Sequence, residues 1–194
     1  MVDLTVPASR GYTTTLPGVG LVGFVSYRWL AARIHEIVND GSVTPDSLPI
    51  IVTYLVGTSA GNAWHDVETL SLKGGGTQPL PYIFSLILGR PGISGYSDVR
   101  PLSHELAECL NDPFGNTAVP GWSATEECGT YLEVADPLDA PAGSGVQVDG
   151  YDLQDTAFFS WFARQSPSIG INDRYTLFGT GGLTTPPPVS SGIC

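Results

Sequence analysis

The sequence predicts an α+β fold, in which a small mixed sheet carries a helix on one face and the second half of the chain is irregular. Up to residue 112 the expected elements follow the order helix, strand, loop, strand, helix, an order that suits this architecture. Hydrophobic residues make up 42% of the 194 residues, which is enough for one domain with a core. We expect one domain over residues 1–178 and an extended or mobile tail, rich in Gly, Thr, Ser and Pro, over 179–194.

The first half supplies one helix and one clear strand. After a polar, β-prone arm, apolar residues at helical spacing predict a helix from about Leu21 to Asn39. It contains the pair His35-Glu36, which we interpret as ordinary surface. The apolar, β-branched run Leu48–Val56 predicts a strand. We expect a loop over Gly57–Leu70, and a flexible turn at the glycines that follow Lys73.

A second helix is framed by strong local signals. The run Tyr82–Leu88 is short, apolar and bounded by Pro and Gly, the profile of a buried strand. Asp98 offers an N-cap oxygen, and Pro101 is tolerated only in the first turn of a helix. Pro113 cannot continue a helix, so the segment should span about residues 100–111.

The second half contains fewer regular signals. We expect a loop over Gly115–Gly129 and a hairpin edge at Val146–Tyr151, with Asp149-Gly150 as its turn. An aromatic cluster should line the core or a groove rather than bind a cofactor; it consists of Phe158, Phe159, Trp161 and Phe162.

The segment His104-Glu105-Leu106-Ala107-Glu108 carries the strongest chemical signal. On a helix, His104 and Glu108 are one turn apart and point the same way, so both could hold one cation. Glu105 would lie beside the metal, as the general base does in the zinc-peptidase motif His-Glu-x-x-His. Here a carboxylate replaces the second histidine, which gives a His-Glu-x-x-Glu motif.

A third protein ligand is needed, because two ligands alone bind a metal weakly. We expect Glu133 to be this ligand. Asp136 is an alternative, or it orients a ligand through a hydrogen bond. His65 is a further alternative, since histidine is a common zinc donor and Asp66 is its neighbour.

The composition excludes some classes of function. With 19 acidic and 8 basic residues, the formal charge of −11 would repel phosphate backbones, so we expect no nucleic-acid partner. No run approaches the roughly 20 apolar residues of a membrane span. Of the three cysteines, Cys109 should pack inward or bridge to Cys128, and Cys194 ends the chain.

Several motifs in order resemble a known family. The segments Ser103–Glu108, Asp112-Pro113, Glu133–Asp136 and Val148–Gly150, with the aromatic stretch around Trp161, are similar to the phosphate-induced, EXORDIUM-like proteins of plant cell walls. They also resemble uncharacterised bacterial and phage proteins with a Ser-His-Glu-x-x-Glu pattern. The resemblance covers about the second half of the chain. It implies a zincin-like domain in a secreted or surface-exposed protein.

These features together predict a metal-dependent hydrolase of the peptidase type. Glu105 would activate a metal-bound water toward a peptide or protein substrate. Zinc is the expected metal, although carboxylate ligands suit calcium or manganese as well. The alternative is a catalytically silent extracellular, surface or assembly protein. In it the same site binds a stabilising metal or none, and the C-terminal tail contacts a partner. Hydrolysis by paired carboxylates, as in glycosidases, stays open; no Gly-x-Ser-x-Gly segment supports a serine hydrolase.

Overall fold

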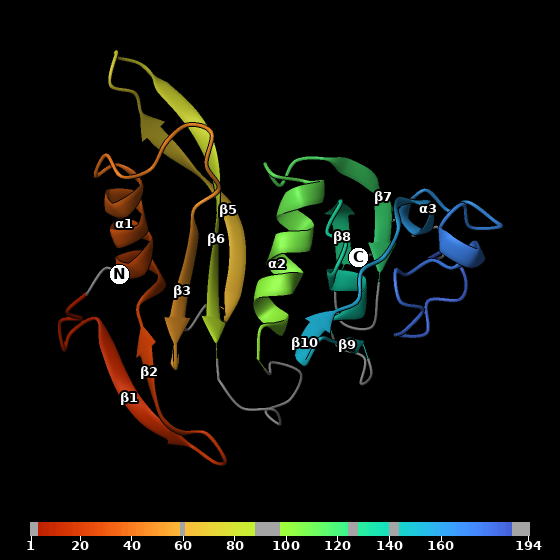
Figure 1. Ribbon diagram of the computed structural model, residues 1–194, viewed down its shortest axis with the longest axis horizontal. Helices are drawn as coiled ribbons and strands as arrows, with labels where there is room; N and C mark the ends of the chain where they lie inside the picture. The colour runs from red at the N-terminus through yellow and green to blue at the C-terminus, as the bar shows by residue number, and fades with distance from the viewer. Residues whose placement is uncertain (1–3, 59–60, 88–97, 124–127, 140–143, 188–194) are drawn as a thin grey trace.

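A computed structural model describes residues 4–58, 61–87, 98–123, 128–139 and 144–187, and within these the protein has the expected α+β fold (Figure 1). Its helices are α1 (Tyr27–Val38), α2 (Arg100–Asn111) and the short α3 (Phe159–Phe162). The strands are β1 (Gly11–Leu16), β2 (Gly20–Val25), β3 (Ile50–Tyr54), β4 (Val56–Thr58), β5 (Ala63–Ser71), β6 (Thr77–Ile87), β7 (Ala118–Ser123), β8 (Cys128–Tyr131), β9 (Gly145–Val148) and β10 (Tyr151–Gln154). Residues 188–194 of the predicted tail, including Cys194, lie outside the described residues.

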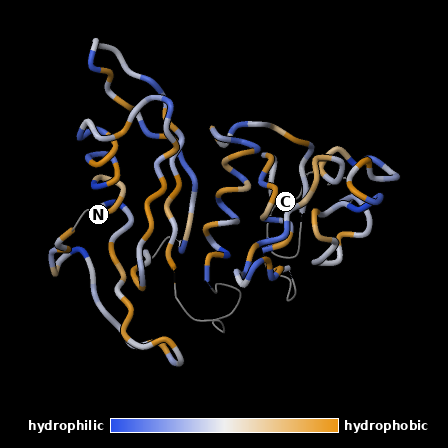
Figure 2. Tube along the Cα trace, viewed as in Figure 1, coloured by the Kyte–Doolittle hydropathy of each residue, from blue (hydrophilic) through white to orange (hydrophobic). Residues whose placement is uncertain are grey.

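A mixed sheet in the order β3-β6-β5 lies between α1 and α2 (Figure 1). Strand β3 runs parallel to β6, and β5 runs antiparallel to β6. On one face, Leu80, Tyr82 and Phe84 of β6 pack with Leu30 and Ile34 of α1 in a hydrophobic core. The apolar stretches of the strands and of α1 lie next to one another in Figure 2.

The other face of this sheet belongs to α2. Side chains alternate along a strand, so Ile83 points away from the core that contains Tyr82 and Phe84. Ile83 is fully buried, and α2 packs against both β6 and β5. A residue of β5 that is paired with Ile83 therefore faces α2. His65 is that residue.

A second core lies beyond α2, around the β7–β8 hairpin and α3. Trp122 on β7 packs edge-on against Trp161 and Phe162, and all three are buried. The predicted aromatic cluster is thus partly core, whereas Phe159 is exposed. Residues after 178 contact this core, because Trp161 donates from Nε1 to the carbonyl of Thr185.

The expected helix at residues 21–39 begins later than predicted. Residues 20–25 form β2, which pairs with β1 and runs parallel to β4. Helix α1 starts at Tyr27. In β2, Val22 and Val25 are buried and Leu21 is exposed. Because the two buried residues are three apart, their spacing resembles that of a helix, and the strand was predicted as part of it.

The loop expected over Gly57–Leu70 is also wrong, since most of it is the long strand β5. The glycine turn after Lys73 is the turn of a β5–β6 hairpin, with Ser71 paired to Thr77. A glycine turn between two strand-like runs is a hairpin signal. That signal was available in the sequence.

Of the other local predictions, some are confirmed and some are wrong. Helix α2 has the predicted bounds, and Pro101 lies in its first turn. Asp98 does not cap it; Val99 is the N-cap residue, and the Asp98 carboxylate accepts the amide of Asp152 instead. The hairpin turn at Asp149-Gly150 is confirmed, with positive φ at both residues. Strands β7 and β8 occupy much of the loop expected over residues 115–129.

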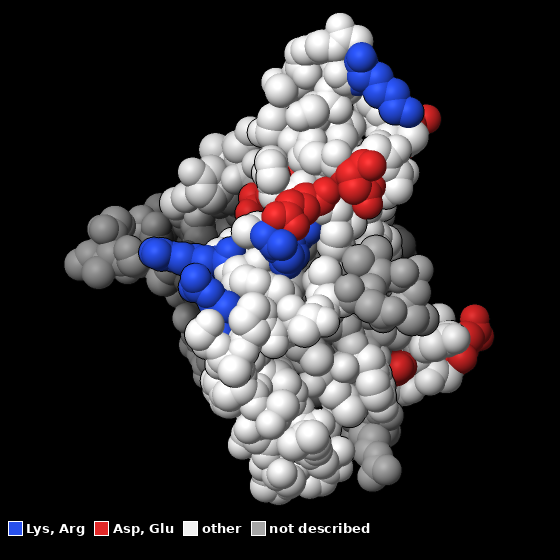
Figure 3. Space-filling model, turned by 90° about the vertical axis from the view of Figure 1, so that its left-hand side faces the viewer, with Lys and Arg blue, Asp and Glu red and all other residues white. Residues whose placement is uncertain are grey.

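Two features of the structure concern a membrane span and the distribution of surface charge. No helix among the described residues combines the length and the apolar character that a membrane crossing requires. On the face shown in Figure 3, acidic and basic side chains lie near one another, so the negative charge is not gathered there as one patch.

Candidate metal centre

The buried face of α2 carries carboxylates. Glu105 and Glu108 are 8% and 3% exposed, and Cys109 packs inward beside them as a free thiol. Ionised carboxylates are costly to bury unless charges or hydrogen bonds compensate them. The polar groups that meet this face therefore define the candidate site.

Strand β5 brings His65 to α2 through its register with Ile83. The His65 ring lies with Nδ1 3.2 Å from Glu105 Oε2 and 3.8 Å from Glu108 Oε2. Its Nε2 is 4.0 Å from Glu133 Oε2. One imidazole from the sheet thus contacts three carboxylates from two other segments.

Glu108 lies at the centre of the site. Its Oε1 accepts the backbone amides of Ala135 and Asp136, each at 3.2 Å. These two hydrogen bonds fix the carboxylate, and its Oε2 lies 3.3 Å from His104 Nε2 in addition to the contact with His65. Glu108 Oε2 is therefore shared between the two imidazoles.

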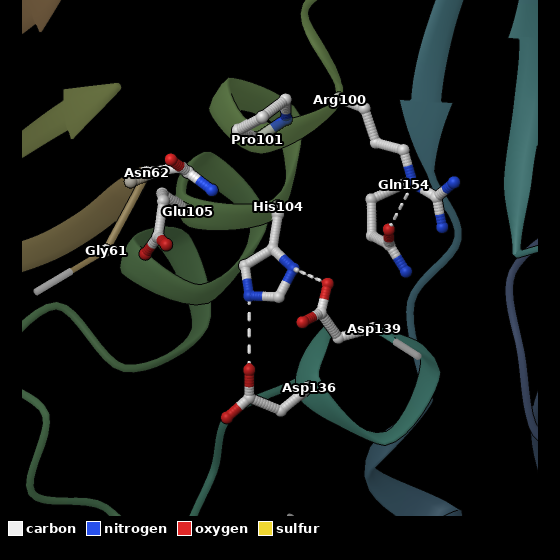
Figure 4. A pocket seen from close by; sticks show the side chains of 10 residues that line it. Gly61, Asn62, Arg100, Pro101, His104, Glu105, Asp136, Asp139 and Gln154 are labelled. Atoms are coloured by element: carbon white, nitrogen blue, oxygen red, sulfur yellow. Dashed lines mark hydrogen bonds and ion pairs between the residues drawn. The ribbon is translucent and has the colours of Figure 1, made fainter. Parts of the chain in front are cut away.

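His104 contacts two acids, Asp136 at the start of the short 3-10 turn Asp136–Leu138 and Asp139 directly after it (Figure 4). Its Nε2 lies 3.2 Å from Asp136 Oδ1, and its Nδ1 lies 3.9 Å from Asp139 Oδ1. Residues three apart in a 3-10 turn lie on the same side, which explains why Asp136 and Asp139 both reach the ring.

The surrounding carboxylates raise the pKa of both histidines. Burial alone lowers the pKa of His65, but the Glu105 hydrogen bond and the charges of Glu133 and Glu108 outweigh it and raise the pKa to about 9. For His104, burial likewise lowers the pKa, while the charge of Glu108 and the hydrogen bond with Asp136 raise it well above 6.5. Without a metal, protonated imidazoles balance part of the negative charge.

The pKa values of two carboxyl groups are raised as well. Burial, and then the charge of Glu108, raise the pKa of Glu133 to about 7, although His65 lowers it. Burial also raises the pKa of Glu108, against the lowering effect of His104. The carboxylate pKa values are raised because burial, together with the charges of neighbouring acids, outweighs the lowering effect of the two histidines.

The donor atoms suit a divalent cation. Two donors of a tetrahedral zinc are about 3.3 Å apart, given metal–ligand distances of about 2.0–2.1 Å. The contacts of His104 Nε2 with Glu108 and Asp136, at 3.3 and 3.2 Å, match this spacing. Glu133 Oε2 is buried with no hydrogen-bond partner, an unfavourable state that a cation would relieve.

The described donors form two overlapping groups around Glu108. One joins His65, Glu108 and Glu133, and the other joins His104, Glu105 and Glu108. The sequence analysis placed His104, Glu108 and Glu133 together, with His65 and Asp136 as alternatives. In the structure Glu108 is common to both groups, but Glu133 is grouped with His65 whereas His104 lies in the other group and contacts Asp136. Asp139 was not foreseen, although its position three residues after Asp136 is a usable signal.

A cavity of about 280 Å³ opens beside the site. His104 and Glu105 line it from α2, together with Asp136 and Asp139. Figure 4 shows His104 between Glu105 on one side and a pair formed by Arg100 and Gln154 on the other. The predicted general base and one predicted ligand therefore face a space that a small part of a substrate could enter.

Comparisons with protein-family models, with curated proteins and with solved structures found no match for this chain. The resemblance to EXORDIUM-like proteins therefore stays a prediction from the sequence motifs.

Proposed function

We propose that this protein is a metal-dependent hydrolase of the peptidase type that binds a divalent cation at Glu108. The observation that carries the proposal is the arrangement of Glu108 between His104 and His65, with Oε1 fixed by two backbone amides. Such outer hydrogen bonds orient a ligating carboxylate and hold its second oxygen toward a metal.

The proposed ligands are His104, Glu108 and Glu133. Glu133 is included because its buried Oε2 accepts no hydrogen bond from a described residue. His65 is the competing donor, because it shares Glu108 Oε2 with His104 and lies in one group with Glu108 and Glu133. Zinc suits this mixture of imidazole and carboxylate, and calcium or manganese would compete where carboxylates dominate.

In this proposal a bound cation supplies Lewis-acid polarisation of the scissile carbonyl and makes a nearby water more acidic. Glu105 acts as the general base, since it is buried at the wall of the cavity. It takes the proton of the attacking water and returns it to the departing amine. His65 Nδ1 holds Glu105 Oε2 at 3.2 Å and so orients the base.

The test combines metal binding with hydrolysis. Purified protein should bind about one equivalent of zinc by equilibrium dialysis and cleave casein. Glu105→Gln should keep the metal and lose cleavage by about 10²-fold or more, since general-base catalysis contributes about 10²–10⁴-fold. Glu108→Gln should lose the metal itself.

The chain offers matched controls in His35 and Glu36, an exposed His-Glu pair on α1. His35→Ala and Glu36→Gln should change neither metal binding nor cleavage. Comparison of His65→Ala with Glu133→Gln ranks the two competing donors by the loss of zinc affinity. Wild-type protein that binds no divalent cation would contradict the proposal.

A second candidate is a catalytically silent surface or assembly protein in which the same ligands bind a stabilising cation. It is favoured by one observation, that Glu105 is paired with His65 rather than left free. Zinc retention by wild type and by Glu105→Gln, with no hydrolysis by either, would support this role.

A further inference from the structure

Arg100 is a buried cation that forms no ion pair with an acid among the described residues. It is the first residue of α2, only 9% exposed, and it lines the cavity beside His104. Among the described residues no carboxylate oxygen lies within 4.0 Å of its guanidinium nitrogens. A buried charge without a counter-charge is unfavourable.

Neutral side chains hold the guanidinium in one place. Its Nε donates to Gln154 Oε1 at 2.7 Å, and Nη2 donates to Ser144 Oγ. Gln154 is itself fixed, because its Nε2 donates to the carbonyl of Leu138. Two of the three guanidinium nitrogens are thus committed to orienting contacts, which add no negative charge.

The third nitrogen, Nη1, makes no hydrogen bond to a described residue. Nη1 is not among the described side-chain atoms that are fully buried and without a hydrogen bond, so it keeps access to solvent. A Cβ on Gly145 would lie 3.1 Å from Nη1 and 2.6 Å from Asp152 Oδ1, so the glycine leaves room there and the Asp152 carboxylate borders the same space without forming an ion pair with Arg100.

The position of Arg100 adds to the attraction for an anion. The N-terminal end of a helix carries partial positive charge, and a cation there is disfavoured unless an anion is near. The N-cap residue, Val99, makes no side-chain capping hydrogen bond to α2, and the Asp98 carboxylate accepts the amide of Asp152 instead. Both features favour a negative group from outside the protein.

We propose that Arg100 binds a carboxylate of the substrate, so that the enzyme acts on peptide bonds close to a negative group. This inference rests on the proposed function for its catalytic part. Arg100 is one turn before His104, about 6 Å along the helix, which is within the length of one or two peptide residues. The carboxylate is either the C-terminus of the peptide or an acidic side chain.

The experiment measures binding first, with metal-free wild-type protein and calorimetry. The probes are an N-acetylated tetra-alanine that ends in a free carboxylate, the same peptide as its amide, and amidated peptides with one internal glutamate or glutamine. We expect a carboxylate to strengthen binding about 10- to 100-fold, the worth of a charge-assisted hydrogen bond. The effective probe identifies which carboxylate is recognised.

Variants tie this preference to Arg100. Arg100→Gln should abolish it, and Arg100→Lys should keep part of it through the charge alone. Arg28→Gln is the matched control, an exposed arginine on α1. If Arg100→Gln does not fold, competition on wild type decides, since succinate should displace the peptide and succinamide should not.

Equal binding of charged and uncharged probes would overturn the inference, as would a preference that survives in folded Arg100→Gln. The outcome for the proposed function is read separately, from hydrolysis by the zinc-loaded protein. Hydrolysis with no preference for a carboxylate would exclude the proposed role of Arg100 and leave the peptidase proposal in place. Carboxylate binding without hydrolysis removes the peptidase proposal alone.

Discussion

Raising the pH should destabilise the metal-free protein. His65 has its pKa raised from 6.5 to about 9, so its contribution to stability is complete below pH 6.5 and is lost as the pH rises through about 9. Glu133 has its pKa raised from 4.5 to about 7, so the folded state retains a proton that the unfolded state releases. Stability is therefore also lost between about pH 4.5 and pH 7.

The expected loss of stability follows from the difference between the ordinary pKa of His65 and its raised pKa in the folded protein. One pH unit of difference in proton binding is worth about 1.4 kcal/mol, so the interval between 6.5 and about 9 corresponds to roughly 3 kcal/mol for His65. We do not add Glu133, because the two groups interact and titrate as a pair. For a domain of this size, about 3 kcal/mol lowers Tm by roughly 6–12 °C.

Zinc should reverse this trend, because its ligands bind in their deprotonated forms. Calorimetric melts from about pH 5 to about pH 9.5, in EDTA and in zinc, should show a falling Tm without metal and a zinc-induced increase that grows with pH. His65→Gln should flatten the slope in EDTA. A Tm that rises from neutral to alkaline pH in EDTA would refute the reasoning.

Two further predictions concern residues that position the site or its neighbouring core. Asp155 is fully buried, and its Oδ2 accepts both the amide and the hydroxyl of Thr180. Asp155→Asn would place an amide donor against these two donors, so it should lower the free energy of unfolding in urea by about 2–4 kcal/mol. A melt of Asp155→Asn within 1 °C of wild type would exclude this. Gly129→Ala puts a Cβ 2.3 Å from the Trp122 ring and should cost about 1–3 kcal/mol, whereas Gly74→Ala, in open space, should change stability by less than about 0.5 kcal/mol. Equal effects of the two alanines would contradict the close packing.

Local signals made α2 predictable. Its proline in the first turn, its stop before Pro113 and the spacing of His104 and Glu108 all depend on residues within a few positions of one another. The side of the helix that carries His104 and Glu108 could therefore be identified from sequence. The same holds for the Asp149-Gly150 turn, whose two residues tolerate positive φ.

Long-range pairing was not predictable in the same way. Whether His65 meets α2 depends on its register with Ile83, and a shift by one residue would turn it to the opposite face. The sequence could only offer His65 as an alternative ligand. Asp98 likewise had the residue type of a cap, but the amide of Asp152, far along the chain, competes for its carboxylate.

The shared position of Glu108 has a consequence for how the chain assembles. His65 comes from the sheet that packs on α1, whereas Ala135 and Asp136 come from the segment after β8, next to the second core. A cation bound by residues of both parts would link the sheet that carries α1 to the segment beside the second core. Its affinity would therefore include the free energy with which these two parts pack together. Chains with only one half folded would release the ion, which would make metal retention a sensitive gauge of complete folding.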